Sequence, residues 1–177
     1  MNITIDQISN ILNQNPPEPS SRKVHYAVLA PIVVRDGRIH LLYELRSEEL
    51  RRQPGDVSFP GGKVEKSETP EQCAVRETAE ELGIPERDVK LIGELCSINT
   101  HDGFSLSCFV AELKDRDFNN SINLVEVQRV FMVPLDFFFD NDPVMVSSWY
   151  EYRYKGFLIW GLTAKLTLRL IELIKNY

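Results

Sequence analysis

Hydrophobic and polar positions follow a helical period at the start of the chain. In residues 5–13 the apolar side chains recur at three- and four-residue intervals, and Thr4 and Gln7 have the spacing of a capping box. This pattern predicts a short amphipathic helix, which we expect on the periphery of the fold. The polar, proline-rich segment that follows is typical of a stiff linker. We therefore divide the chain into an N-terminal helix and linker, residues 1–22, and one main domain, residues 23–177.

The next part of the chain is rich in β-branched and aromatic residues, which favour strands. Two such runs, residues 24–34 and 38–44, are separated by Asp36-Gly37, a strong turn signal, and are predicted to form a hairpin. Further strands are predicted over residues 89–98, 104–113 and 125–133. Residues 47–62 form a long segment rich in proline and glycine. Loops of this length are usually functional or disordered, and the charges and glycines here favour a functional loop.

Two further segments, residues 71–82 and 160–174, have the hydrophobic period of amphipathic helices. At about 100° per residue, three glutamates of the first helix fall within roughly a third of its circumference, opposite the side that faces a core. These glutamates are Glu77, Glu80 and Glu81. Like charges at this spacing destabilise a helix by a few tenths of a kcal/mol per pair. A solvated, glutamate-rich surface is one explanation of the pattern, and a bound divalent cation is the other.

The residues around this helix favour the cation. Mg²⁺ and Mn²⁺ prefer oxygen ligands, and two glutamates one turn apart, Glu77 and Glu81, can reach the same ion. The preceding segment Phe59-Pro60-Gly61-Gly62 has unhindered backbone that can approach a phosphate or present a carbonyl group to a metal. Glu68 in the loop and Arg76 on the helix are predicted to form an ion pair that braces the loop.

Composition narrows the classes of function. The chain has 177 residues, of which 43% are hydrophobic and 26% charged, as expected for one soluble, well-cored domain. Its net charge of −6 gives no overall attraction for nucleic acid or an anionic membrane, so an anionic small-molecule substrate would need a local cation and arginines. Three cysteines without paired metal-ligand spacing, and no recognisable targeting segment, favour the reducing cytoplasm.

The stretch GKVEKSETPEQCAVRETAEELGI, residues 62–84, resembles the Nudix box. In that box a glycine and a glutamate precede Arg-Glu-U-x-Glu-Glu-x-Gly-U, where U is a bulky aliphatic residue. The matching residues are Gly62, Glu68, Arg76, Glu77, Glu80, Glu81, Gly83 and Ile84. The departure is Thr78, which stands at a U position. We expect its side chain to face the core and its hydroxyl to donate a hydrogen bond to the helix carbonyl of Ala74.

The resemblance implies an α/β fold, the Nudix α/β/α sandwich with a mixed β-sheet between helices. It also implies a pyrophosphohydrolase that cleaves a diphosphate joined to another moiety. When the roles of the family's residues are transferred by position, the resemblance implies that Glu77 and Glu81 bind a catalytic Mg²⁺ or Mn²⁺. The carbonyl of Gly61 is a further candidate ligand. Glu80 is left as a general base or a ligand of a second metal. Glu126 lies outside the box. It could be a general base or an extra metal ligand, or equally an ordinary glutamate at the end of a strand.

A second motif lies upstream of the box. Its residues resemble, in type and spacing, the motif of the coenzyme A pyrophosphatase branch. They are Arg46-Ser47, Arg51, Gly55 and the segment Phe59-Pro60-Gly61-Gly62. That motif begins Leu-Leu-Thr-x-Arg, whereas this chain has Leu42-Tyr43-Glu44-Leu45-Arg46, a difference that bears on substrate affinity. Similar stretches continue downstream. They include Thr100, Gly103-Phe104, Glu126-Val127 and residues 159–164.

The second resemblance implies hydrolysis of the diphosphate of coenzyme A, or of a derivative, to 3′,5′-ADP and 4′-phosphopantetheine. Arg46 and Arg51 would bind phosphate oxygens in bidentate fashion, with Gly61 and Gly62 close to the substrate. The alternative is that both arginines merely solvate the loop.

Two other functions stay open. One is a Nudix hydrolase of ADP-ribose, a dinucleotide or another nucleoside diphosphate derivative. The other is a non-catalytic nucleotide-binding module, which is expected to lose a ligand carboxylate; none is lost here. The sequence also leaves open whether the chain forms a homodimer.

Overall fold

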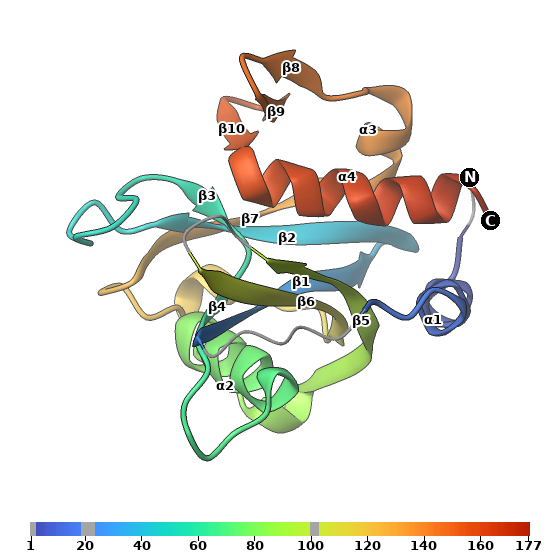
Figure 1. The fold of residues 1–177 in the computed structure, drawn as a ribbon. Helices are drawn as coiled ribbons and strands as arrows, with labels where there is room; N and C mark the ends of the chain where they lie inside the picture. Colours follow the sequence, from blue (N-terminus) through green and yellow to red (C-terminus); the bar gives the residue numbers. More distant parts are fainter. Residues whose placement is uncertain (1–2, 19–23, 100–102) are drawn as a thin grey trace.

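A mixed sheet of seven strands forms the middle layer of the molecule (Figure 1). The computed structural model describes residues 3–18, 24–99 and 103–177, so Thr100 of the second motif lies outside the described residues. The strands of this sheet are β1 (Val24–Arg35), β2 (Arg38–Arg46), β3 (Val57–Ser58), β4 (Gly61–Lys63), β5 (Val89–Asn99), β6 (Phe104–Leu113) and β7 (Val127–Pro134). Their order is β3-β2-β1-β6-β5, with β4 also paired to β1 and β7 to β2. The β1–β6 pair is parallel and the other pairs are antiparallel.

One long helix covers each face of this sheet (Figure 1). Helix α2 (Pro70–Leu82) buries Ala74 and Leu82 in a hydrophobic cluster on one face, and α4 (Gly161–Lys175) buries Leu166 and Leu170 in a second cluster on the other. The predicted α/β/α sandwich is therefore confirmed. No helix in the described part of the chain is both long and apolar enough to span a bilayer.

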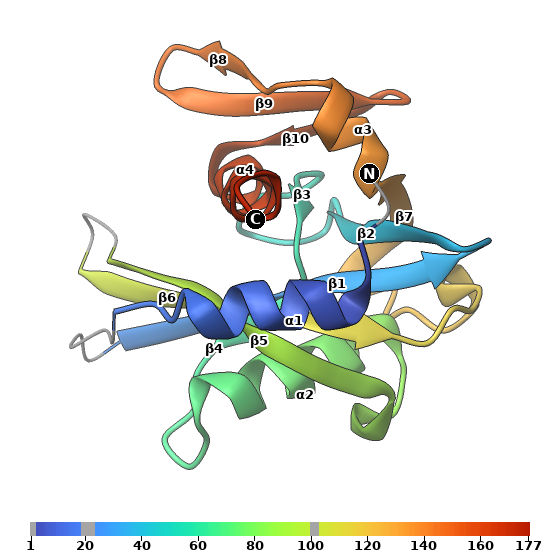
Figure 2. The same cartoon turned by 90° about the vertical axis from the view of Figure 1, so that its right-hand side faces the viewer.

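A smaller layer lies on the outer side of α4 (Figure 2). It consists of an antiparallel sheet of three strands and a short helix. These elements are β8 (Val144–Val146), β9 (Trp149–Tyr154), β10 (Phe157–Trp160) and α3 (Leu135–Asp140). Two single-turn 3₁₀ helices lie elsewhere: Glu86–Asp88 between α2 and β5, and Phe118–Asn120 between β6 and β7. The hydrophobic pattern had resolved none of the three outer strands.

The N-terminal helix α1 (Ile5–Gln14) begins at the predicted capping box, in which Thr4 and Gln7 bond each other's backbone N–H groups. The expectation that this helix is peripheral was wrong. Ile8, Ile11 and Leu12 are fully buried against β5, in the same cluster as α4 (Figure 2). The apolar stripe thus completes the main core, and a boundary at residue 22 stays a prediction.

The predicted hairpin is confirmed and fixes the register of the two long strands. Asp36 and Gly37 both have positive φ, at 51° and 71°, as a two-residue turn of this kind requires. Arg35 pairs with Arg38, and the pairing continues to Ile32 opposite Leu41. Beyond it, the long loop of residues 47–62 holds the short strand β3 and the start of β4.

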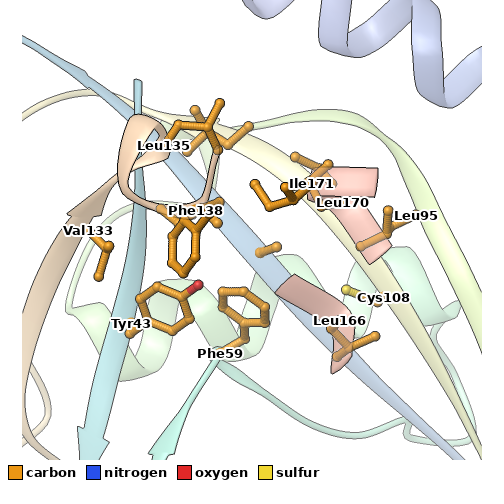
Figure 3. Close-up of a cluster of buried hydrophobic side chains, with 14 of the residues drawn as sticks. Tyr43, Phe59, Leu95, Cys108, Val133, Leu135, Phe138, Leu166, Leu170 and Ile171 are labelled. Atoms are coloured by element: carbon orange, nitrogen blue, oxygen red, sulfur yellow. The ribbon is translucent and has the colours of Figure 1, made fainter. Parts of the chain in front are cut away.

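Tyr43 of β2 lies in the buried cluster beneath α4 (Figure 3). Its ring stacks on those of Phe59 and Phe131, with centroids 4.8 and 5.6 Å away, and its hydroxyl lies 2.8 Å from the Thr167 hydroxyl of α4. Side chains of a strand alternate between its two faces. The residue after Tyr43 therefore points to the opposite face, towards α2, and that residue is Glu44.

Candidate active site

Four glutamates from three segments of the chain are electrostatically coupled, and we call them the carboxylate cluster. Glu44 comes from β2, Glu77 and Glu81 from α2, and Glu126 from the turn before β7. Their charges act on one another. Burial, and then the charge of Glu44, raise the pKa of Glu81 to about 10, with smaller contributions from Glu77 and Glu126. Burial is also the largest cause that raises the pKa of Glu44 to about 7.

Glu81 is the most enclosed of the α2 glutamates. Only 3% of the residue is exposed, and its Oε2 accepts a hydrogen bond of 2.9 Å from the backbone N–H of Gly61. Gly61 has a φ of +154°, and a Cβ there would lie 2.3 Å from the carbonyl oxygen of Ala27 on β1. Glycine is therefore required at the point where β4 crosses close to β1 and bonds Glu81.

Glu77 lies against the next glycine. Its pKa is raised, chiefly by burial, and its Oε1 forms an ion pair of 2.9 Å with Nη1 of Arg76. A Cβ on Gly62 would lie 2.3 Å from this same oxygen. The two glycines after Pro60 thus bring backbone directly onto the two predicted metal-ligand glutamates.

We expect Gly62→Ala to reduce the specific activity of diphosphate hydrolysis by roughly 10- to 100-fold, because the added methyl group displaces the carboxylate of Glu77. The carboxylate is the far end of a flexible side chain, so the melting temperature should change little. Gly93→Ala is the matched control: its Cβ would meet Cβ of Leu12 at 3.0 Å in the core. That variant should lose stability and keep its specific activity. Equal activity losses in both variants would contradict the assignment of Glu77.

Glu80 differs from its two neighbours. Its side chain is 59% exposed, and it forms an ion pair of 3.3 Å with Nη1 of Arg76. The solvated-surface explanation therefore fits Glu80 and is wrong for Glu81. The helical period puts both on one side of α2, but only Glu77 and Glu81 are covered by β4.

Two local predictions for α2 are confirmed. Arg76 forms two hydrogen bonds to Glu68, of 3.0 Å from Nε and 2.7 Å from Nη2, and this pairing lowers the pKa of Glu68 to about 2. The loop before α2 is therefore braced by a bidentate ion pair. Thr78 is fully buried, and its hydroxyl donates a hydrogen bond of 2.7 Å to the carbonyl of Ala74.

Glu126 and Arg46 meet at the end of β2. The backbone N–H of Ser47 donates a 2.8 Å hydrogen bond to the carbonyl of Glu126, and the charge of Glu126 contributes to the raised pKa of Glu44, Glu77 and Glu81. Nη1 of Arg46 lies 3.9 Å from Oε1 of Glu44, and its Nε is buried and has no hydrogen-bond partner in the part of the chain that the structure describes. Arg46 is therefore a cation beside the cluster with an unused hydrogen-bond donor.

Arg51 is placed differently. It lies exposed in the loop between β2 and β3, and within the described residues it forms no ion pair. Of the two predicted phosphate-binding arginines, the fold brings only Arg46 to the carboxylate cluster.

The sequence analysis missed Glu44 as a site residue. It is 1% exposed; its Oε1 accepts a 2.9 Å hydrogen bond from Ser58, and its Oε2 is buried with no hydrogen-bond partner among the described residues. Two signals were visible in the sequence. Glu44 is a charged residue directly after the apolar run Leu41-Leu42-Tyr43, and it stands where the coenzyme A pyrophosphatase motif has a threonine. A buried carboxylate with an unpaired oxygen is costly, so it calls for a partner.

Comparison with known proteins decides the family. The family described as NUDIX domain matches residues 23–150, more than half of the chain. The chain belongs to the Nudix family. It is an enzyme of the Nudix pyrophosphohydrolase class, whose members bind small nucleotide diphosphates and typically use divalent metal ions.

Two relatives and one solved structure illustrate the match. The chain is 32% identical to the peroxisomal coenzyme A diphosphatase of Mus musculus over 84% of this chain and 69% of that protein. It is also 32% identical to the uncharacterized Nudix hydrolase NudL of Photorhabdus laumondii, over 96% of this chain and 97% of that protein. The Ap4A hydrolase of C. elegans superimposes with a TM-score of 0.56 at 21% identity, over 88% of this chain and all of that one, which shows a shared fold.

The residues of this Nudix enzyme fit a divalent cation. The unpartnered, buried Oε2 of Glu44 and the mutual repulsion of buried carboxylates are both relieved by positive charge at this point. Within residues 3–18, 24–99 and 103–177, no three Asp, Glu, His or Cys side chains are already gathered as a metal site. Arg76 is bound to Glu77, so a cation would compete with this guanidinium for that carboxylate.

Proposed function

We propose that this Nudix enzyme hydrolyses the diphosphate of coenzyme A, or of a coenzyme A derivative, to 3′,5′-ADP and 4′-phosphopantetheine. The observation that carries the proposal is the place of Arg46. This residue matches the first arginine of the coenzyme A-type motif, and its Nη1 lies 3.9 Å from Oε1 of Glu44 while its Nε is a buried donor without a partner among the described residues. The name of the mouse relative, a coenzyme A diphosphatase, supports the same substrate.

We assign the metal-binding role to Glu77 and Glu81, with the backbone of Gly61 beside them and Glu44 as an additional carboxylate. A bound Mg²⁺ or Mn²⁺ supplies neutralisation of diphosphate charge and makes water a better nucleophile. Water adds one oxygen to a phosphorus, the bridging P–O bond breaks, and each product leaves as a phosphate monoester. Arg46 holds a phosphate oxygen through its unused donors.

For the general base we favour Glu126 over Glu80. A base must lie close to the proton that it accepts. Glu126 is half-buried, and its charge raises the pKa of all three other members of the carboxylate cluster. Glu80, in contrast, is exposed and forms an ion pair with Arg76. Arg51, exposed in the loop, is left to bind an outer phosphate group such as the 3′-phosphate of coenzyme A.

Mass spectrometry of the products tests the proposal. We expect purified protein with Mg²⁺ or Mn²⁺ to convert coenzyme A to 3′,5′-ADP and 4′-phosphopantetheine, and EDTA to stop the reaction. ADP-ribose and dinucleoside polyphosphates are incubated in parallel. If one of these is cleaved and coenzyme A survives, the Nudix chemistry stands and the proposed substrate is wrong. If every compound survives, a non-catalytic nucleotide-binding module becomes the leading hypothesis.

The cellular compartment also stays a proposal. The cysteine pattern favours a reducing compartment such as the cytoplasm, and the residues described include free cysteines at positions 73, 96 and 108. The mouse relative is peroxisomal by its name. Fluorescence microscopy of the tagged chain in its native cell distinguishes a cytoplasmic from a peroxisomal distribution.

A further inference from the structure

A cavity of about 370 Å³ lies between the start of α4, the loop that carries β3, and the two tryptophans. Figure 1 shows the first turn of α4 beside β3 and β10. Most of the wall is apolar. It includes Val28, Val57, Phe59, Leu106, Leu162 and Leu166. Small-molecule sites are typically about 300–1,000 Å³, lined by apolar side chains with a few polar groups. We call this space the tryptophan cavity.

The tryptophan cavity adjoins the carboxylate cluster through two lining residues that each lie against a glutamate of the cluster. Gly61 lines the cavity, and its N–H bonds Glu81 at 2.9 Å. Arg46 also lines the cavity, and its Nη1 lies 3.9 Å from Oε1 of Glu44. A moiety attached to a diphosphate at the carboxylate cluster would therefore start beside the cavity.

The charges of the lining favour an uncharged occupant. Arg46 and Asp56 are the charged lining residues, of opposite sign, and Asp56 accepts a 3.3 Å hydrogen bond from the indole of Trp160. A phosphate group inside would face the Asp56 carboxylate, which disfavours it. The exposed cations of the same loop, Arg51 and Arg52, are not part of the lining.

The uncharged polar groups of the lining match amides. The side chains of Gln53, Ser58 and Thr163 border the cavity beside the apolar wall. Gln53 offers both a donor and an acceptor, the Thr163 hydroxyl can act as either, and the Ser58 hydroxyl, which donates to Glu44, can still accept. A chain with branched methyl groups and secondary amides satisfies both kinds of wall at once.

We propose that the tryptophan cavity receives the uncharged, amide-bearing pantetheine arm of the substrate, whereas the nucleotide half stays outside, near the exposed arginines of the loop. This assignment rests on the proposed coenzyme A substrate. It makes the cavity wall a determinant of specificity: diphosphates without such an arm leave it unfilled.

Intrinsic fluorescence tests the proposal directly. The chain has two tryptophans, Trp149 and Trp160, and both line the cavity, so tryptophan emission reports on this place alone. The full chain is titrated with 4′-phosphopantetheine and, separately, with 3′,5′-ADP. We expect saturable changes in emission with phosphopantetheine. After correction for absorbance, 3′,5′-ADP should leave the emission unchanged.

Matched variants locate the binding. Leu162→Gln places a polar group in the cavity wall and should weaken phosphopantetheine binding by roughly 10-fold or more. Leu168→Gln is the control, because Leu168 is a partly buried residue of the same helix outside the lining. If Leu162→Gln does not fold, Trp149→Ala replaces it: Trp149 is 51% exposed, so its loss alters the cavity with little effect on the core.

The proposal is overturned if 3′,5′-ADP changes the emission and phosphopantetheine does not, since the nucleotide then occupies the cavity. It is also overturned if neither ligand changes the emission, or if Leu162→Gln and Leu168→Gln bind phosphopantetheine equally well. The proposed function fails by a separate readout, the survival of coenzyme A in the product assay. Binding of the isolated arm is measured without turnover, so the two failures are distinguishable.

Discussion

Glu81→Gln is expected to lower kcat for diphosphate hydrolysis by roughly 1,000-fold or more. The side-chain carbonyl of the introduced glutamine can still accept the 2.9 Å hydrogen bond from the Gly61 N–H, so the local support of β4 is retained. The lost property is negative charge at a buried point that we assign to a divalent cation. Metal ions contribute several kcal/mol of charge stabilisation, and about 4 kcal/mol corresponds to a factor of about 1,000 in rate. Steady-state kinetics with Mg²⁺ or Mn²⁺ measure the loss.

Glu80→Gln is the matched control for this experiment. It makes the same chemical change one residue away, at a side chain that is 59% exposed and paired with Arg76. We expect its kcat to stay within about threefold of the wild type, because an exposed ion pair contributes little. The reverse ranking, with Glu80→Gln inactive and Glu81→Gln active, would transfer the catalytic role to Glu80. Similar melting temperatures in both variants exclude misfolding as the cause.

The contrast between these two glutamates shows how far the sequence determines the site. Helical periodicity places Glu77, Glu80 and Glu81 on one side of α2, and the motif marks all three. Neither the periodicity nor the motif shows where β4 lies relative to α2. Close packing of Gly61 and Gly62 over α2 encloses Glu77 and Glu81 and leaves Glu80 in solvent. Burial of a particular carboxylate is a tertiary property, so it could not be read from the local pattern.

Interactions between residues close in sequence, in contrast, could be predicted. The capping box at Thr4, the turn at Asp36-Gly37, the Glu68–Arg76 pair and the Thr78 hydroxyl each depend on residues close in sequence, and each is present. The errors involve long-range packing. The amphipathic period of α1 could not reveal that β5 lies opposite its apolar face, and the strand pattern around Glu44 could not reveal that α2 lies opposite its carboxylate.

The carboxylate cluster also predicts an unusual pH dependence of stability in metal-free protein. A folded-state pKa above the unfolded value means that the folded state holds its proton more tightly, so stability decreases as pH rises between the two values. For Glu44 this window runs from 4.5 to about 7, and for Glu81 from 4.5 to about 10. In EDTA, the wild type should therefore be more stable near pH 5 than near pH 8.5.

Glu44→Gln removes one carboxylate and, with it, part of the repulsion that raises the pKa of Glu81. The amide oxygen can keep the hydrogen bond from Ser58, while the titration of Glu44 disappears. A pKa of about 7 in place of 4.5 corresponds to on the order of 3 kcal/mol over the full window. We expect the wild-type melting temperature in EDTA to fall, relative to that of Glu44→Gln, by roughly 5–10 °C between about pH 5 and pH 8.5.

The comparison between variants removes the effect of titrating groups that Glu44 does not influence. The pKa of His25 is lowered by burial, so His25 changes stability in the opposite direction, but equally in the wild type and in Glu44→Gln. Glu80→Gln again serves as the exposed control and should follow the wild type. Saturating Mg²⁺ or Mn²⁺ should raise the wild-type melting temperature most at the high-pH end, where the carboxylates are ionised and can bind the cation. Parallel melting curves for the wild type and Glu44→Gln at every pH, with and without metal, would remove Glu44 from the site.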